Sequence, residues 1–319
     1  MMRARAVEQH MSVFKSNSSL LGVVLGLASF FIFPLHDALA KWLVKDFSVW
    51  QIMFVRSGII LLLIALANGA RPFPQAYRSP VRSLLAMRAL IIVAAWAMYY
   101  SAARYLPLGE LVTIYFGSPI LVALMAGPIL RERVSTGRWL AVLVGFAGVV
   151  IACRPGLGAT APIWLALGAA ALWSMSTILI RLTRLAEPTS VNMVMTNLGF
   201  FVFAGMMIPW VWRTPSLHDW LIFVTIALTG AASQFLLFEA IRRASASTIA
   251  PLEFTSLGWA FLLGWLVWHD VPNLLVVTGA LLIGFSGLII VSIEWRESVR
   301  LKEAGTPEVR GPAREGERA

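Results

Sequence analysis

The sequence contains little charge and almost no cysteine. Only 13% of its 319 residues are charged, against roughly 25% in soluble domains, so the chain lacks the polar surface of a soluble fold. Cys153 is the only cysteine, which excludes an intrachain disulfide and a thiolate-rich metal site. The four histidines (His10, His36, His218 and His269) show no ligand spacing. We therefore expect no metal and no cofactor.

Motifs of membrane-embedded or ATP-driven enzymes are also missing. Ser286 lies in a Gly-Phe-Ser-Gly segment that resembles the turn of an intramembrane serine protease, but no histidine follows it. An aspartyl intramembrane protease needs two deep aspartates, and Asp37 is the only one expected at depth. No GxxxxGK[ST] motif is present to bind phosphate. The sequence therefore predicts that the protein is not an enzyme, and that any transport is driven by a gradient or by exchange.

Long apolar runs dominate the sequence. Runs of roughly 18 to 24 residues match the length needed to cross a hydrocarbon core of about 30 Å. Backbone groups within lipid must be satisfied internally, so these runs are predicted to be helices. The predicted fold class is an all-α integral membrane protein with ten transmembrane helices, at residues 20–43, 47–68, 83–102, 106–129, 136–153, 161–180, 189–212, 218–239, 247–268 and 273–293.

Polar segments flank the apolar region. Residues 1–18 are predicted to be an N-terminal tail, and the charged residues 294–319, which include Pro and Gly, a disordered C-terminal tail. The first apolar segment has an alternative interpretation as a cleavable signal peptide, because it has a basic start and Ala38-Leu39-Ala40. His36 and Asp37 are poor neighbours for a cleavage site, which favours a retained helix.

One stretch of the sequence occurs twice. Arg104 aligns with Arg242 and Glu132 with Asp270, each 138 positions apart. Each copy is two apolar segments joined by a polar link that carries an acid. An internal repeat of this kind decides the architecture. It divides the chain into two five-helix repeats, residues 20–153 and 161–293.

The distribution of Lys and Arg predicts the orientation. With the N-terminus inside, the cytoplasmic side collects 19 of these residues and the outer links only four: Lys45, Arg104, Arg154 and Arg213. By the positive-inside rule both termini are cytoplasmic. Five helices is an odd number, so the two repeats lie in opposite orientations. The basic residues are thus explained by topology, and no nucleic-acid partner is expected.

Inverted repeats are typical of transporters that open alternately to the two sides of a membrane, with the site near the midplane between the halves. The alternative is a duplicated scaffold, that is, a non-transporting structural or assembly subunit of a membrane complex. Charged residues at membrane depth favour the transporter, because a scaffold does not need them.

Short motifs in a fixed order support this interpretation. They are Phe54-Val55-Arg56-Ser57, Arg88, Ala102-Ala103-Arg104-Tyr105, ILRE at 129–132, and Gly145-Phe-Ala-Gly148 with Gly284-Phe-Ser-Gly287. With these motifs the chain resembles the drug/metabolite transporter superfamily, and within it the EamA-type transporters, over about residues 20–293. The resemblance implies a carrier of the bacterial inner membrane for a small organic metabolite, such as an amino acid, a nucleoside-like compound, S-adenosylmethionine or riboflavin. Direction, coupling to protons and assembly as a homodimer stay open.

Charged side chains at membrane depth are the main site candidates. Asp37 and Arg56 lie at similar depths on neighbouring segments, so we expect both to face a central cavity and to interact. Glu253 follows Pro251, which can open a bend, and is a candidate for a substrate amine or a coupling proton. A pair with Arg242 or Arg243 at the rim is the alternative.

Further candidates are weaker. His36 could line the cavity or join two helices, Arg88 could be interfacial, and Lys41 is expected to snorkel to the surface. Glu132 and Asp270 are interpreted as anchors of their links, and the Gly-Phe-(Ala/Ser)-Gly motifs as close helix packing. Aromatic and amide side chains that could line the cavity, or simply pack, are Trp96, Tyr99, Tyr115, Trp173, Asn197 and Gln234.

Overall fold

The computed structural model describes residues 2–118, 120–122, 125, 136–153, 160–183, 187–243 and 252–304. Within these ranges every regular element is an α-helix. Outside the described residues lie the ILRE motif at 129–132, which includes Glu132, and the prolines Pro119 and Pro251. The elements of the first repeat are α1 (Met2–Leu43), α2 (Val49–Asn68), α3 (Pro72–Arg78), α4 (Arg82–Ala103), α5 (Leu108–Tyr115) and α7 (Thr136–Cys153). Those of the second are α8 (Ala161–Thr183), α9 (Thr189–Val211), α10 (Leu217–Arg243), α12 (Thr255–Trp268) and α13 (Leu274–Ala304).

Six helices of the described part are long and apolar enough to cross a membrane, and they belong to α1, α2, α4, α8, α9 and α10. The remaining four predicted segments coincide with shorter apolar helices: Leu108–Val122, Trp139–Cys153, Thr255–Trp268 and Leu274–Ile289. The all-helical, multi-pass fold class is confirmed, whereas the number of ten crossings stays a prediction. Helix α3 was not predicted. Pro72 and Pro74 lie in its first turn, where the backbone N–H groups have no partner within the helix, so proline is tolerated there.

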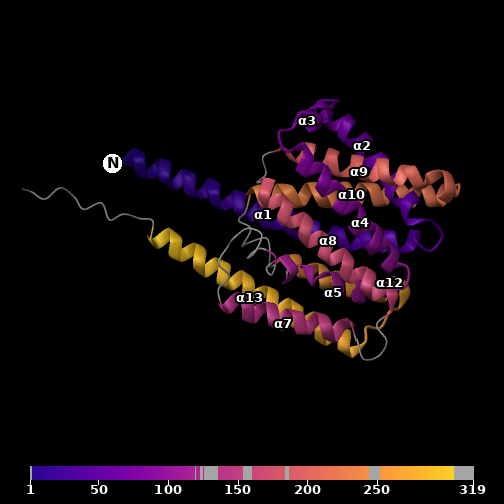
Figure 1. The fold of residues 1–319 in the computed structure, drawn as a ribbon. Coiled ribbons are helices and arrows are strands. Elements are labelled where there is room, and N and C mark those ends of the chain that lie inside the picture. Colours follow the sequence, from indigo (N-terminus) through magenta and orange to yellow (C-terminus); the bar gives the residue numbers. More distant parts are fainter. Residues whose placement is uncertain are drawn as a thin grey trace, which may run out of the picture.

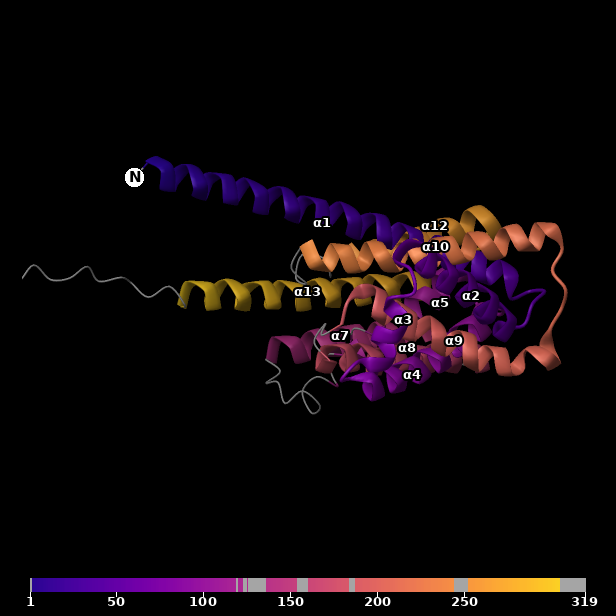
Figure 2. The same cartoon turned by 90° about the horizontal axis from the view of Figure 1, so that it is seen from above.

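The two terminal helices are longer than the sequence indicated. Helix α1 begins at Met2, and α13 continues to Ala304, past the end of the predicted span. Both extend from the same end of the bundle (Figures 1 and 2). The prediction of disorder from residue 294 is therefore wrong for residues 294–304. This segment contains neither glycine nor proline, and the first such residue is Gly305.

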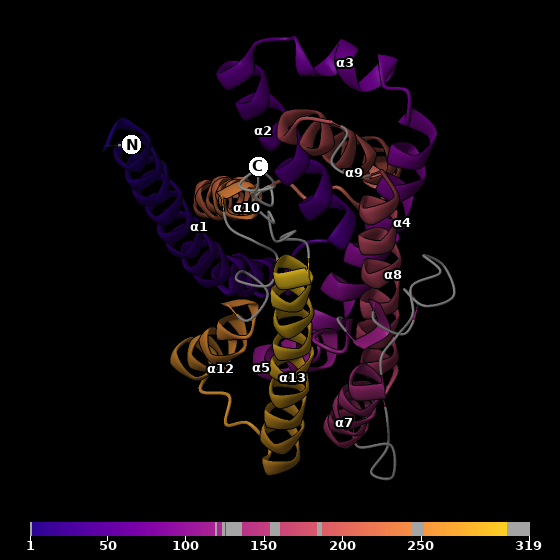
Figure 3. The same ribbon diagram turned by 90° about the vertical axis from the view of Figure 1, so that its left-hand side faces the viewer.

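The largest helix contacts join one repeat to the other. Helix α1 packs on α10, α4 on α8, α2 on α9 and α7 on α13. Helix α1 of the first repeat corresponds to α8 of the second, and α4 corresponds to α10. The α1–α10 and α4–α8 contacts are therefore equivalent. The α2–α9 and α7–α13 contacts each join a helix to its own counterpart in the other repeat. Figure 3 shows α7 and α13 side by side at the edge of the bundle opposite α3. This arrangement is the one expected for a two-fold related pair of repeats.

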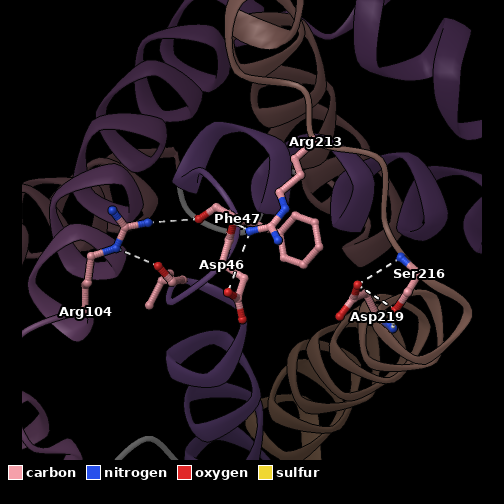
Figure 4. A network of polar contacts seen from close by, with 7 residues as sticks. Asp46, Phe47, Arg104, Arg213, Ser216 and Asp219 are labelled. Carbon is pink, nitrogen blue, oxygen red and sulfur yellow. Dashed lines mark hydrogen bonds and ion pairs between the residues drawn. The ribbon is translucent and has the colours of Figure 1, made fainter.

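The opposite end of the bundle from the termini is held by a polar network, which we call the Asp46 face (Figure 4). Arg104 donates to the carbonyls of Val44 (2.6 Å) and Phe47 (3.1 Å) and so fixes the α1–α2 loop. Arg213, from the α9–α10 loop, donates to the Asp46 carbonyl (3.0 Å) and lies 3.6 Å from its carboxylate. Loops of both repeats therefore meet at this face.

Close packing of α7 on α13 depends on glycine. A Cβ placed on Gly148 would lie 2.8 Å from the carbonyl oxygen of Gly279, and one on Gly279 would lie 2.6 Å from that of Gly148. The hydroxyl of Ser286 donates to the Ala141 carbonyl at 2.6 Å across the same contact. Small residues let helix backbones approach closely in membranes. Gly284 differs from these, since a Cβ there would meet nothing within 4 Å.

We predict that Gly148→Ala destabilises the protein. The methyl group would meet a backbone oxygen of α13, and overpacking of this kind costs roughly 1–3 kcal/mol. Thermal unfolding of the purified protein in detergent measures the effect. Gly284→Ala is the matched control and should leave the midpoint unchanged or slightly raised. Equal midpoints for the two variants would show that the α7–α13 contact is looser than the structure indicates.

Candidate substrate site

A cavity lies between the two repeats. Its free volume is about 90 Å³, below the roughly 300 Å³ at the lower end of ligand pockets. The cavity is therefore contracted, and a metabolite would need the walls to move apart. Helices α1, α4 and α5 line it from the first repeat, and α8, α10 and the α12 region from the second. The lining residues are Phe30, Phe33, Pro34, Asp37, Ala95, Trp96, Tyr99, Val112, Tyr115, Phe116, Trp173, Leu237, Glu253 and Ser256.

Four aromatic candidates form a continuous series along the cavity. Trp96 and Tyr99 meet edge to face at 5.6 Å between ring centroids, and so do Tyr99 and Tyr115 at 5.0 Å. The rings of Tyr115 and Trp173 are tilted at 53° to each other, with 5.9 Å between their centroids. The series runs from α4 through α5 to α8 and thus crosses between the repeats. Edge-to-face pairs hold rings in fixed orientations. Such a wall offers aromatic faces and edges to a planar or cationic ligand.

Asp37 projects into the cavity from α1. The Tyr99 hydroxyl donates to its Oδ2 atom at 2.9 Å. Pro34, one turn earlier in the same helix, lacks a backbone N–H, so the helix forfeits one hydrogen bond beside the cavity. The carboxylate is therefore oriented by Tyr99, while its second oxygen is left for a ligand.

Glu253 approaches the cavity from the second repeat, in the turn before α12. Among the described residues its carboxylate has no hydrogen-bond or ion-pair partner. The alternative predicted from the sequence, a pair with Arg243, is not formed, because Arg243 pairs with Glu239 on α10; the Arg242 side chain lies outside the described residues. A carboxylate without a partner in an apolar setting requires a proton or a cation.

Tyr115 and Glu253 occupy equivalent positions of the two repeats, 138 residues apart, and so do Phe116 and Phe254, whose rings meet at 5.7 Å. Helix α5 ends at Tyr115, and α12 begins just after Phe254. Both repeats thus interrupt a helix at the cavity, as discontinuous helices do at the sites of many transporters.

Arg56 is placed differently from the prediction. It is 1% exposed and does not belong to the cavity lining. Its Nη1 atom donates to Nε2 of His36 at 3.0 Å and to the Tyr100 hydroxyl at 2.9 Å, not to Asp37. The guanidinium packs on the rings of Trp96 (5.2 Å) and Phe200 (5.1 Å). Its charge therefore lies behind Trp96 rather than in the cavity.

His36 joins helices and does not line the cavity. It is 1% exposed, with Nδ1 at 3.0 Å from the Ile226 carbonyl of α10 and Nε2 at 3.0 Å from the Tyr100 hydroxyl. A carbonyl only accepts, so Nδ1 carries the proton. Nε2 then accepts from Arg56, which assigns a neutral imidazole.

The structure does not bring the other polar candidates to the cavity. Arg88 donates to the Thr196 hydroxyl at 3.2 Å between α4 and α9. Asn197 is fully buried and donates to the Met193 carbonyl at 2.8 Å. Gln234 lies half-buried on α10, outside the lining.

Sequence reasoning missed some residues of the site. Tyr100 accepts a hydrogen bond from Arg56. The only indication of this role in the sequence was that Tyr100 directly follows the candidate Tyr99. Phe116 and Ser256 line the cavity, and the repeat register was the signal for Phe116. Lys41 does not snorkel, since it is 8% exposed and lies 3.8 Å from Asp270.

Two helical repeats that pack on each other, with an aromatic and acidic cavity between them, define a multi-pass membrane transporter of the two-repeat class. The chain belongs to the EamA-like transporter family, which matches residues 20–154 and 160–293, one match for each repeat. The resemblance noted from the motifs is thereby confirmed.

Several relatives have assigned names. The chain is 27% identical to a riboflavin transporter of Brucella anthropi over 70% of this chain and 82% of the relative. It is 24% identical to the pseudopaline exporter CntI of Pseudomonas aeruginosa over 82% and 93% of the two chains. It is also 24% identical to an S-adenosylmethionine uptake transporter of Rickettsia bellii over 81% and 89%. A solved crystal structure with 18% identity shares the fold, with a TM-score of 0.59 over 88% of this chain and 99% of the other.

The position of Arg56 leads to a stability prediction. Tyr100→Phe keeps the ring but removes the hydroxyl that accepts from the guanidinium, and a buried hydrogen bond to a charged group contributes about 1.5–3 kcal/mol. We expect a lower thermal unfolding midpoint in detergent. Tyr105→Phe, at a 67% exposed tyrosine just after the same helix, is the control and should not change it. If both variants unfold like the parent, the Tyr100 contact does not hold Arg56.

Proposed function

We propose that the protein is a secondary transporter that moves a small organic metabolite across the bacterial inner membrane by alternating access, with both termini cytoplasmic. The observation that carries the proposal is a cavity walled by both repeats. Helices α1, α4 and α5 face α8, α10 and the α12 region across it. Any movement of one repeat against the other changes the cavity and its exposure to either side.

The charge of the cavity favours a cationic substrate. Asp37 and Glu253 line it, and its described lining residues include no lysine, arginine or histidine. The aromatic series beside the two carboxylates adds cation–π attraction. Among the compounds that relatives are named for, S-adenosylmethionine carries a sulfonium cation, whereas riboflavin is neutral. The cavity therefore fits a positively charged compound with a planar ring better than a neutral one.

The orientation is supported by two observations. The extended ends of α1 and α13 lie at the same end of the bundle (Figure 2), and the count of Lys and Arg along the sequence assigns 19 of them to the side of the two termini and four to the opposite links. With that end cytoplasmic, the Asp46 face is the outer side. Import and export are both compatible with this arrangement.

Matched ligands test the charge preference. S-adenosylmethionine and S-adenosylhomocysteine differ mainly in the sulfonium charge, and tryptamine and tryptophol differ in the ammonium. We expect the charged member of at least one pair to raise the unfolding midpoint of the purified protein and its neutral partner not to. Glu253→Gln should remove this difference because it removes the negative charge. Glu187 does not line the cavity and accepts a hydrogen bond of 2.7 Å from the Ser79 hydroxyl. Glu187→Gln should therefore keep the difference between charged and neutral ligands. Preference for the neutral members, or an unchanged preference in Glu253→Gln, would refute a cationic substrate.

Asp37 is the proposed coupling residue, because one carboxylate oxygen is oriented by Tyr99 and the other is available to a proton. In liposomes, uptake of the compound identified above should respond to an imposed pH gradient. Asp37→Asn should transport without that response, since an amide does not titrate in this range. Asp219→Asn is the control, because this acid accepts from the Ser216 hydroxyl at the Asp46 face and does not line the cavity. Flux that ignores the gradient in the parent protein would exclude proton coupling and leave exchange or facilitated flow.

A further inference from the structure

Lys41 is a buried charge that the cavity does not use. It lies on α1, four residues after Asp37, roughly 6 Å nearer to the Asp46 face. Its ammonium donates to the carbonyl of Leu106 in the α4–α5 link and lies 5.3 Å from the centre of the Trp268 ring. Its ion-pair partner is Asp270, at 3.8 Å. The group is thus fixed from three directions.

Asp270 belongs to the second repeat, and its position is fixed by the end of α12. His269 adopts a left-handed conformation with φ 55° and closes the helix through its N–H to the Trp265 carbonyl (3.0 Å). The N–H of Asp270 then donates to the Gly264 carbonyl (3.2 Å). This C-cap places the carboxylate against α1. The sequence interpretation of Asp270 as an anchor of its own link is therefore incomplete, because it also contacts the other repeat.

The pair stands between two separate spaces. Asp37 lines the substrate cavity, one helical turn before Lys41. Asp270 lines a second cavity of about 200 Å³, whose walls include Pro107 of the α4–α5 link, Glu110 of α5 and Asn273 of the α12–α13 link. The two cavities share no lining residue among those described. Lys41 and Asp270 thus link the helix that lines the substrate cavity to the wall of this second cavity.

We propose that the Lys41–Asp270 ion pair closes the substrate cavity toward the Asp46 face and breaks when the cavity opens there. The inference rests on the proposed function, since it assigns one gate of the alternating cycle. An ion pair suits this role for an energetic reason. The Lys41 and Asp270 side chains are 10% and 27% exposed, and the attraction in a largely buried pair is mostly offset by the loss of hydration. When the repeats separate, both charges regain their hydration. The pair therefore fixes the geometry of the closed form but adds little to the free energy needed to open it.

Accessibility of a cysteine in the cavity tests the gate without any substrate. The reporter is Ser256→Cys, at a cavity-lining position, in a Cys153→Ala background. Its reaction with a membrane-impermeant maleimide is followed in right-side-out and inside-out vesicles. Asp270→Asn and Lys41→Met each remove one charge while keeping the shape of the side chain. We expect either to raise the labelling rate from the Asp46 face by roughly tenfold, because removal of one partner of a buried pair is strongly destabilising.

Two controls accompany these variants. Asp270→Glu keeps the charge, as Glu132 does at the equivalent position of the first repeat, and should label as slowly as the parent. Asp46 forms an ion pair with Arg213 at the same face, and their side chains are 64% and 65% exposed. Exposed ion pairs contribute little to stability, so Asp46→Asn removes a charge without removing a strong contact. It should also label slowly. The unfolding midpoint of each variant identifies those that label quickly only because they unfold.

The outcomes separate this inference from the proposed function. Faster labelling in Asp270→Asn and Lys41→Met, but not in Asp270→Glu or Asp46→Asn, supports the gate even if no tested compound is transported. Unchanged labelling in the two charge-removing variants overturns the gate, whether or not transport is observed. Faster labelling in Asp46→Asn as well would assign closure to the loop network of the whole face and would likewise overturn a specific Lys41–Asp270 gate.

Discussion

A buried guanidinium is the constraint on which the centre of this bundle depends. A charge at membrane depth is costly unless polar or aromatic groups surround it. Arg56 on α2 meets this requirement through His36 of α1, Tyr100 of α4 and the ring of Phe200 on α9. His36 extends the network to the Ile226 carbonyl of α10. Helices of both repeats are therefore fixed around one group, which also supports Trp96 from behind.

The same group balances the charge of the site. The two carboxylates of Asp37 and Glu253 face the cavity, and Arg56 lies one layer behind it, on the far side of Trp96. Electrostatic attraction acts through that layer without contact, because the effective dielectric of the interior is low. The region as a whole then carries about one excess negative charge when both acids are ionised. A single cation, either a substrate or a proton, neutralises it, so binding of one can displace the other.

The sequence specified depth along each helix but not rotation about its axis. Asp37 and Arg56 were expected to face each other on neighbouring helices, but α1 packs mainly on α10 and α2 on α9. Successive residues of a helix also differ by about 100° in direction. The structure turns His36 toward Arg56 and Asp37 toward the cavity. The close packing of α7 on α13 could be predicted, because each of the two helices carries its own glycine motif. A contact between the repeats, such as Lys41 with Asp270, depends on how two distant segments are placed, and no local pattern encodes that.

The repeat register explains why such a bundle can have two forms of similar free energy. Contacts of α1 with α10 and of α4 with α8 are equivalent under the repeat, so a second arrangement with the roles of the repeats exchanged would bury comparable surfaces. Tyr115 and Glu253 share a register position but differ in chemistry. The two forms are thus close in free energy but not identical. In the proposed cycle, a ligand needs a differential affinity of only a few kcal/mol to shift the population from one to the other.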